Sequence, residues 1–240
     1  MVILALDTTT RAGSVAIARD DQVLALVPGD AARTHGERLP GEIDRALIDA
    51  GLSPRDLDLL VVASGPGAFT GLRIGLAAIQ GLAMVVAAPV IGVSALDAMA
   101  ESLWASLQDG GPARLVVWMD AQRGEVFEGR YVASPTGRSW LAECDPSVAP
   151  PDAALAHLVD DSSRPTLFSG DGAERYRGVI QAWSATARLL DTPRALAPAL
   201  ARLGRRGAER GLAGPPHALQ PLYVRRPDAE LERLRRAPSA

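Results

Sequence analysis

The sequence contains no lysine, so all 25 of its basic residues are arginine. This excludes a Schiff-base lysine, the lysine of a phosphate-binding P-loop and a lysine general base. Cys144 is the single cysteine, which excludes an intramolecular disulfide and a metal cluster built on cysteine. The histidines, His35, His157 and His217, lie far apart without a partner at metal-ligand spacing. We therefore predict neither a metal site nor a bound cofactor.

Aromatic residues make up only 4% of the chain and hydrophobic residues 48%, so the core must be built mainly from Ala, Val, Leu and Ile. The length of 240 residues suits one large domain or two small lobes. The net charge of -3 gives no general case for nucleic-acid binding. The apolar start has no basic segment and reaches Asp7 too soon for a signal peptide. We predict a cytoplasmic protein that contacts no membrane.

The longest apolar stretch of the chain follows a glycine turn. The run 59–63 predicts a buried strand, the Gly-Pro-Gly at 65–67 a tight turn, and a helix begins near residue 70 and ends at about residue 87. Beyond the first residue of this helix only Arg73 and Gln80 are polar, and both lie on one narrow face. The helix is a little short for a membrane span. It needs burial on nearly every side, and we expect a second chain to cover one of them.

Small residues recur every three or four positions along this helix. Such spacing lets the backbone of another helix approach closely. Packing onto the sheet of the chain itself explains the same pattern, and both can hold at once. The small residues are Gly71, Gly75, Ala78 and Gly81.

The second half of the chain repeats features of the first. The run 115–119 ends in Asp120 as the first strand ends in Asp7, and residues 167–173 repeat residues 62–68. Two matches in the same order and at similar spacing indicate a duplicated lobe. We predict an N-terminal lobe over 1–107, a C-terminal lobe over 108–220 and a tail or helix over 221–240.

Spacing and turn residues predict further elements within these bounds. An amphipathic stripe over residues 39–50 contains Leu39 and Leu47, and Gly51 is typical of the cap that ends such a helix. The pattern also predicts helices over 95–107, 152–159 and 228–236, a hinge at 108–112, a loop at 146–151 and a short extended piece over 221–224.

A candidate nucleotide site follows from the strand ends and glycine turns. A glycine turn that opens a helix favours an anion, because its N–H groups and the helix dipole point to one place. The turn here lacks the lysine and the spacing of known phosphate loops, and a tight turn explains its glycines as well. The aspartates could hold Mg²⁺ or position a nucleophile, or they could only satisfy their own turns. The candidate residues are Asp7, Thr8, Gly65, Gly67, Asp120, Gly170 and Gly172, with Asp171 beside them.

Two further features each allow two interpretations. His35, directly before a predicted helix, could be a general base or a capping and packing residue. From Arg202 to the end there are nine arginines and four acidic residues. Four of these arginines share a helical face that could contact RNA phosphate or simply face solvent: Arg202, Arg205, Arg206 and Arg210.

Several stretches together resemble the bacterial TsaB family, also called YeaZ. The most specific is the string GPGAFTGLRIG at 65–75. Residues 3–9 and 35–40 also match. Looser matches lie at 90–94, 120–126 and 221–225, so the resemblance covers most of the chain.

The resemblance implies a two-lobed actin-like fold of the ASKHA, ribonuclease H-like type, with duplicated βββαβα lobes of which the second is degenerate. It implies a non-catalytic subunit for threonylcarbamoylation of adenosine 37 in ANN-decoding tRNAs, which pairs with and activates the transferase TsaD. TsaE joins the complex, tRNA binds through it, and the isolated subunit forms a homodimer. The implied pairing surface lies on the helices at 36–50 and 71–87, with Leu39, Ile43, Leu47, Arg73, Ile74, Ala77, Ala78 and Gly81 as candidates.

The sequence also departs from its relatives. The catalytic paralogue carries its metal on a His-x-x-x-His pair, which aligns here with Ala95 and Met99, and neither side chain binds a metal. Ala68 stands where many relatives have serine, which removes a hydroxyl from the glycine loop. The first departure leaves a peptidase activity of this chain unsupported, and the second weakens any phosphate-binding role of the loop.

Two other functions stay open. One is an ATP-binding enzyme of the sugar-kinase, Hsp70 and actin superfamily that uses Asp7, Asp120 and residues 170–172. The other is a tRNA-contacting module over residues 202–236. Nucleotide binding that depends on Asp7 would favour the first, and salt-sensitive tRNA binding by the chain alone would favour the second.

Overall fold

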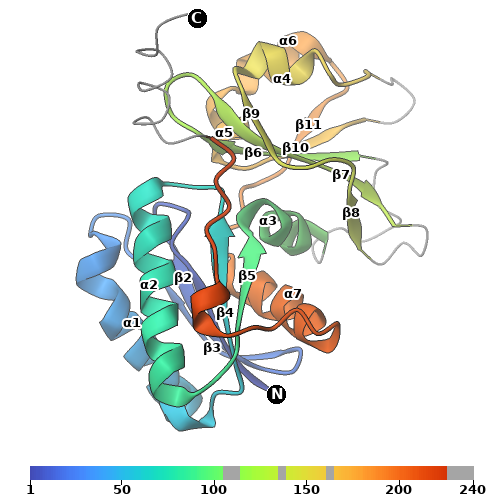
Figure 1. The fold of residues 1–240 in the computed structure, drawn as a ribbon. Coiled ribbons are helices and arrows are strands. Elements are labelled where there is room, and N and C mark those ends of the chain that lie inside the picture. Colours follow the sequence, from blue (N-terminus) through green and yellow to red (C-terminus); the bar gives the residue numbers. More distant parts are fainter. Residues whose placement is uncertain (105–113, 135–138, 161–164, 226–240) are drawn as a thin grey trace, which may run out of the picture.

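Two α/β lobes, each with one mixed sheet, make up the part of the chain that the computed structural model describes (Figure 1). The described residues are 1–104, 114–134, 139–160 and 165–225.

The first sheet is built from the apolar runs of the N-terminal half, in the order β3-β2-β1-β4-β5. The first three strands are antiparallel neighbours, and β4 and β5 continue the sheet in parallel with β1. All of β4 and nearly all of β1 is buried, as expected for strands covered on both faces. The strands are β1 (Val2–Asp7), β2 (Ser14–Arg19), β3 (Gln22–Pro28), β4 (Leu59–Gly65) and β5 (Val90–Ser94).

Two long helices, α1 (His35–Ala50) and α2 (Phe69–Val86), cover the outer face of this sheet (Figure 1). Each ends at a residue in the left-handed conformation, Gly51 with φ 65° and Ala87 with φ 57°. The predicted glycine cap of α1 is thereby confirmed. A short 3₁₀ helix, η1 (Pro54–Asp56), joins α1 to β4.

The second sheet repeats the arrangement of the first, in the order β11-β10-β6-β7-β8, with β9 also paired to β7. Strands β6 and β7 are antiparallel, and β10 and β11 run parallel to β6. Strands β6, β7, β10 and β11 therefore occupy the positions that β1, β2, β4 and β5 have in the first sheet. This correspondence confirms the predicted duplication. The strands are β6 (Arg114–Asp120), β7 (Val126–Ala133), β8 (Trp140–Ala142), β9 (Ser147–Ala149), β10 (Leu167–Ser169) and β11 (Arg188–Leu189). The helices on its outer face are α4 (Pro151–Leu155), α5 (Asp171–Arg175) and α6 (Arg177–Trp183).

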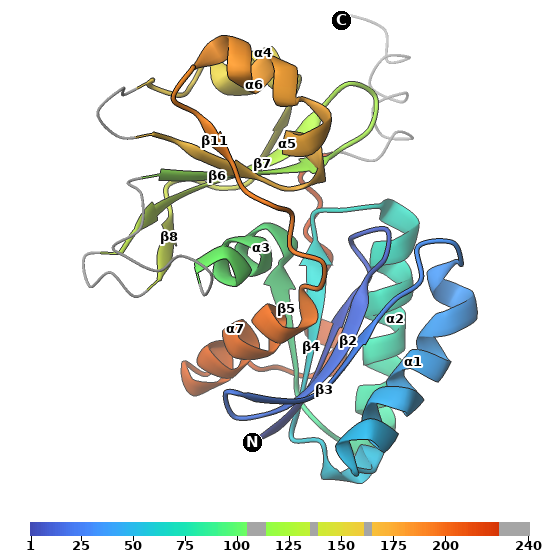
Figure 2. The ribbon, with the colours of Figure 1, turned by 180° about the vertical axis from the view of Figure 1, so that it is seen from behind.

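In the part of the chain that the structure describes, the last α-helix of each half packs between the two sheets (Figure 2). Helix α3 (Ala95–Trp104) follows the first sheet but also contacts β6, β7 and β8 of the second. Helix α7 (Ala197–Glu209) follows the second sheet but packs on β1 and β2 of the first, and against α3. The final 3₁₀ helix, η2 (Pro216–Ala218), lies against α2.

Three apolar clusters result from this layering. Alternate side chains of a strand point to opposite faces, so Leu4 packs with α1 and α2 while Ala5 packs with α7. The central cluster joins α3 and α7 to both sheets. The third cluster, around Trp118 and Phe168, lies between the second sheet and its outer helices.

The structure adds elements that the sequence pattern did not indicate. Residues 146–151 were expected to be a loop, but β9 lies within them, and the helix expected over 152–159 ends at Leu155. The end of the helix predicted over 95–107, the hinge at 108–112 and the last helix at 228–236 lie outside the described residues. The lobe boundaries stay a prediction.

Candidate functional site

Asp7 stands at the end of β1 with 1% of its surface exposed. Its carboxylate accepts hydrogen bonds from the Thr9 amide at 2.8 Å, the Thr9 hydroxyl at 2.6 Å and the Thr10 hydroxyl at 2.6 Å. Both carboxylate oxygens are therefore occupied by the turn that follows the strand. This geometry accounts for Asp7 as the residue that closes the β1–β2 turn.

The glycines around the first turn of α2 allow close packing on that same β1–β2 turn. A Cβ at Gly67 would overlap Thr9, and a Cβ at Gly75 would overlap the hydroxyl of Thr8. Gly71 likewise lies against the Thr8 carbonyl. The Thr8 hydroxyl is buried without a hydrogen-bond partner, so helix backbone directly covers it.

The corresponding residues of the second lobe lie at the ends of β6 and β10, where they bond to one another. Asp171 accepts hydrogen bonds from the amides of Asp120 and Gly172, both at 3.0 Å. Burial raises the pKa of the Asp171 carboxyl above its ordinary value, and these two hydrogen bonds oppose the rise. Asp120 in turn binds Arg175 at 2.6 Å. A Cβ at Gly170 would overlap the Trp118 carbonyl, so its glycine serves close packing.

The candidate nucleotide residues thus fall into two groups, one at the strand ends of each lobe. In each group the carboxylates bond to neighbouring turns of the same lobe. Among the described residues, no group of three or more His, Cys, Asp or Glu is arranged to hold a metal.

The candidate interface residues on α1 and α2 differ in exposure. Leu39 and Leu47 are buried in the cluster beneath the helices, so they support the surface rather than form it. The half-buried candidates are Ile43, Ile74 and Ala78, and the exposed ones are Arg73, Ala77 and Gly81.

The structure adds large apolar side chains to this surface. Met84 is 79% exposed and Val85 is 82% exposed. Both lie about two turns beyond Ala77 and about one turn beyond Gly81 on α2. Ile48 on α1 and Phe69 at the start of α2 are also exposed. Met84 follows Ala77 by seven residues, which is two helical turns. Extending the helical spacing from Ala77 would therefore have identified Met84 from the sequence. We call the exposed residues Arg73, Ala77, Gly81, Met84 and Val85 the α2 face.

An aromatic contact closes one end of the α2 face. The Phe69 and Tyr223 rings stack with their centroids 5.6 Å apart. The Arg73 guanidinium lies 4.0 Å from the Phe69 ring centroid, and its Nε donates a hydrogen bond to the Tyr223 hydroxyl at 3.2 Å. Arg73 is therefore held in place by residues from two distant parts of the chain.

His35 begins α1 beside the β1–β2 turn. Its Nδ1 lies 2.7 Å from Nη2 of Arg38, and its ring lies close to Gly13 and Gly71. Burial, followed by the positive charge of Arg38, lowers the pKa of His35 below 6.5. The cap of the helix is Thr34, whose amide and hydroxyl both bind Glu37. The structure therefore favours a packing role for His35.

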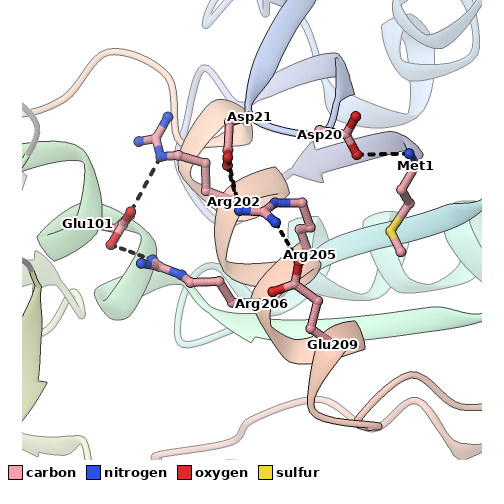
Figure 3. Close-up of polar contacts among 8 residues, drawn as sticks. All are labelled: Met1, Asp20, Asp21, Glu101, Arg202, Arg205, Arg206 and Glu209. Atoms are coloured by element: carbon pink, nitrogen blue, oxygen red, sulfur yellow. Dashed lines mark hydrogen bonds and ion pairs between the residues drawn. The ribbon is translucent and has the colours of Figure 1, made fainter.

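The arginines of α7 form ion pairs with α3, with the turn between β2 and β3, and within α7 itself (Figure 3). Glu101 of α3 pairs with Arg202 at 3.3 Å and Arg206 at 2.6 Å. Arg205 pairs with Asp21 at 2.8 Å and with Glu209. With the terminal ammonium paired to Asp20, three guanidinium groups and one ammonium face four carboxylates. These arginines join elements together, and the cluster carries no net charge.

The comparisons with known proteins agree with this architecture. The family model of the tRNA N6-adenosine threonylcarbamoyltransferase TsaD matches residues 18–231. The tRNA threonylcarbamoyladenosine biosynthesis protein TsaB of Bacillus subtilis is 30% identical over 230 residues, which cover 96% of this chain and 96% of that protein. This chain belongs to the TsaB family.

Other members of the TsaB family show the same relationship. The TsaB protein of Escherichia coli is 38% identical over 155 residues, which span 63% of this chain and 64% of that protein, slightly under two thirds of its length. Among solved structures, YeaZ from Pseudomonas aeruginosa is 26% identical with a TM-score of 0.78, covering 92% of this chain and 99% of that one. The two-lobed α/β fold predicted for the family, with one mixed sheet in each lobe, is confirmed.

Helix α2 of this TsaB-family chain has a further property. It is the one helix among the described residues that is long and apolar enough to cross a membrane, judged by length and composition alone. The core helix of a soluble protein passes the same test, and Leu72, Leu76 and Ile79 of α2 pack on the first sheet. A single helix of this kind is weak evidence for a membrane protein.

Proposed function

We propose that this TsaB-family protein is a non-catalytic subunit in tRNA threonylcarbamoyladenosine biosynthesis, which pairs with and activates a TsaD-type transferase. Its relatives in Bacillus subtilis and Escherichia coli are named for that pathway, and the matching family model is that of the transferase. These relationships favour this function over ATP turnover.

We place the pairing surface on the α2 face. Met84 and Val85 expose most of their apolar surface beside the small residues Ala77 and Gly81. A small-residue stripe flanked by large apolar side chains gives a partner helix both close approach and area to bury. Helix α1 lies beside α2 (Figure 1), and its Ile48 is also exposed.

The positions aligned with the metal-binding histidines of the catalytic paralogue support a non-catalytic role. Ala95 is fully buried and Met99 is 1% exposed, and both pack in the central cluster between the lobes. Neither side chain supplies a metal ligand. Activation of the transferase would therefore come from contact and not from chemistry at this position.

The proposal extends to the wider assembly. We expect TsaE to join the complex, tRNA to bind through the complex, and the subunit alone to form a homodimer through the α2 face. We expect the complex to act in the cytoplasm. The neutral arginine cluster of α7 supports the view that tRNA contacts depend on the transferase.

The decisive experiment measures the solution mass of the purified chain, alone and mixed with TsaD from the same organism, by light scattering. We expect a homodimer that converts to a one-to-one heterodimer. Ala77→Arg should abolish both assemblies while circular dichroism remains unchanged, because a charge would be buried against an apolar partner.

Ala153→Arg is the matched control, because Ala153 is an exposed alanine on α4 of the other lobe. This variant should pair normally. Normal pairing by Ala77→Arg would exclude the α2 face as the contact, and a chain that ignores TsaD would overturn the proposed function itself.

A further inference from the structure

The C-terminal segment 219–225 runs from one lobe to the other. It leaves η2 beside α2, passes the end of β4 and reaches the second lobe (Figure 1). The sequence predicted only a short extended piece over 221–224. Its contacts with both lobes give it a structural role that the sequence pattern did not indicate.

The segment is anchored in the first lobe by three consecutive contacts. Leu219 is buried in the cluster beneath α2. The Leu222 amide donates a hydrogen bond to the Ser64 carbonyl at 2.6 Å, and the Leu222 carbonyl lies so close to Gly65 that a Cβ there would overlap it. Tyr223 stacks on Phe69 as described above. The segment therefore covers the point where β4 ends.

Arg225 anchors the segment in the second lobe. Its Nη1 donates a hydrogen bond to the Ala121 carbonyl at 2.8 Å, and its Nη2 pairs with the carboxylate of Glu125. The guanidinium also lies 5.7 Å from the Phe127 ring centroid. Ala121 and Glu125 belong to the turn that follows β6. Arg225 thus binds the second lobe at the end of its central strand.

We propose that residues 219–225 are a strap that locks the two lobes at one angle and covers the carboxyl ends of β4 and β6. Ligands of open α/β sheets bind at the carboxyl ends of the parallel strands, and closure of two lobes there requires relative motion. The strap occupies that edge and ties both lobes to one short segment. The proposal concerns the chain alone and does not depend on pairing with a transferase.

The single cysteine makes a distance measurement between the lobes direct. Cys144 is exposed in the second lobe, and Arg55 is exposed at the far end of the first. Arg55→Cys therefore gives two labelling sites without removal of any native cysteine. Spin labels at both sites report the distribution of distances between the lobes by pulsed electron paramagnetic resonance.

In the Arg55→Cys parent, diluted with unlabelled chain so that distances between two protomers do not contribute, we expect one narrow distribution. Adding Arg225→Ala should broaden or shift it, because one end of the strap is released. Tyr223→Ala should do the same from the other end, and the two changes together should have no larger effect than either alone. This lack of additivity distinguishes a strap from two independent local contacts.

Arg114→Ala is the matched control. Arg114 also pairs with one carboxylate, of Glu143 at 3.2 Å, and one carbonyl, of Val159 at 3.5 Å, but all three residues lie in the second lobe. Its removal should leave the distribution unchanged. Glu125→Ala removes the same ion pair as Arg225→Ala and should reproduce its effect if the latter variant folds poorly.

An unchanged distribution in folded Arg225→Ala and Tyr223→Ala would overturn the strap. So would additive broadening, or equal broadening in Arg114→Ala. None of these outcomes bears on pairing with TsaD, which is measured by mass.

Discussion

The hydroxyl of Tyr131 donates a hydrogen bond to the carboxylate of Asp97 at 2.7 Å, and this bond joins β7 of the second lobe to α3, which follows the first sheet. Both groups are largely buried between the lobes. Burial raises the pKa of Asp97 above its ordinary value of 3.8, and the hydrogen bond from Tyr131 partly opposes that rise.

Asp97 gives stability a pH dependence of unusual sign. Because the folded carboxyl holds its proton to higher pH than the unfolded one, this group lowers the free energy of unfolding as pH rises from 3.8 through its raised pKa. Asp97→Asn removes the buried charge and keeps an oxygen for Tyr131. We expect the variant to be more stable than the wild type at neutral pH. In urea unfolding the difference should shrink as pH falls toward 3.8, and a pH-independent difference would contradict this.

Two glycines of α2 should respond in opposite directions to alanine. Gly75→Ala forces a methyl group into the Thr8 side chain and should cost about 1–3 kcal/mol. Gly81→Ala meets no atom of its own chain within 4 Å, and at concentrations where the chain is monomeric it should add about 0.5–1 kcal/mol through helix propensity. Urea unfolding measures both. Thr8→Ala should restore most of the loss in the Gly75→Ala background; simple additivity of the two losses would refute the contact.

The ion pairs of Glu101 should matter more than surface pairs. Glu101→Gln leaves Arg202 and Arg206 without their shared carboxylate and should lower the free energy of unfolding by about 1–2 kcal/mol. Asp49→Asn, which breaks the exposed pair with Arg45, should cost less than about 0.5 kcal/mol and serves as the control. Equal losses of unfolding free energy in the two variants, measured by thermal or urea unfolding, would show that the ion pairs of Glu101 stabilise the fold no more than an exposed pair does.

Asp7 should act on stability and not on catalysis. Asp7→Ala removes the acceptor of three hydrogen bonds in a buried turn and should cost about 2–3 kcal/mol. Where the variant is folded, it should still support threonylcarbamoylation of tRNA in the complete complex. Loss of that activity in a folded variant, together with nucleotide binding by the wild type that Asp7→Ala abolishes, would favour a catalytic cleft instead.

Local patterns were sufficient to predict most of the first lobe. The continuous apolar runs of β1 and β4 are typical of strands buried on both faces, and Gly51 marks the end of α1 because it adopts a positive φ. In the second lobe, β11 has two residues and β9 three, which is too short for any periodicity. Those strands exist because β10 and β7 supply partners, and sequence spacing does not report that.

The candidate sites were harder to predict than the elements that carry them. The stripe that contains Leu39 and Leu47 correctly predicted a buried helix face. Helical spacing does not distinguish burial against the chain's own sheet, which the structure shows, from burial against a partner. The contacts of Asp7 with Thr9 and Thr10 are local and fit the Asx turn that the sequence allowed. Arg225 binds Ala121 across about a hundred positions, and no local pattern predicts so distant a partner.

The placement of α7 on the first sheet has a consequence for synthesis of the protein. The N-terminal sheet lacks the cover for one of its faces until residues 197–209 have emerged from the ribosome, long after β5 is complete. The nascent first lobe therefore exposes Ile3, Ala5 and Val61 while the second lobe is still being translated. We expect the chain to fold in one cooperative step after α7 has emerged, and a fragment that stops at residue 107 to be insoluble.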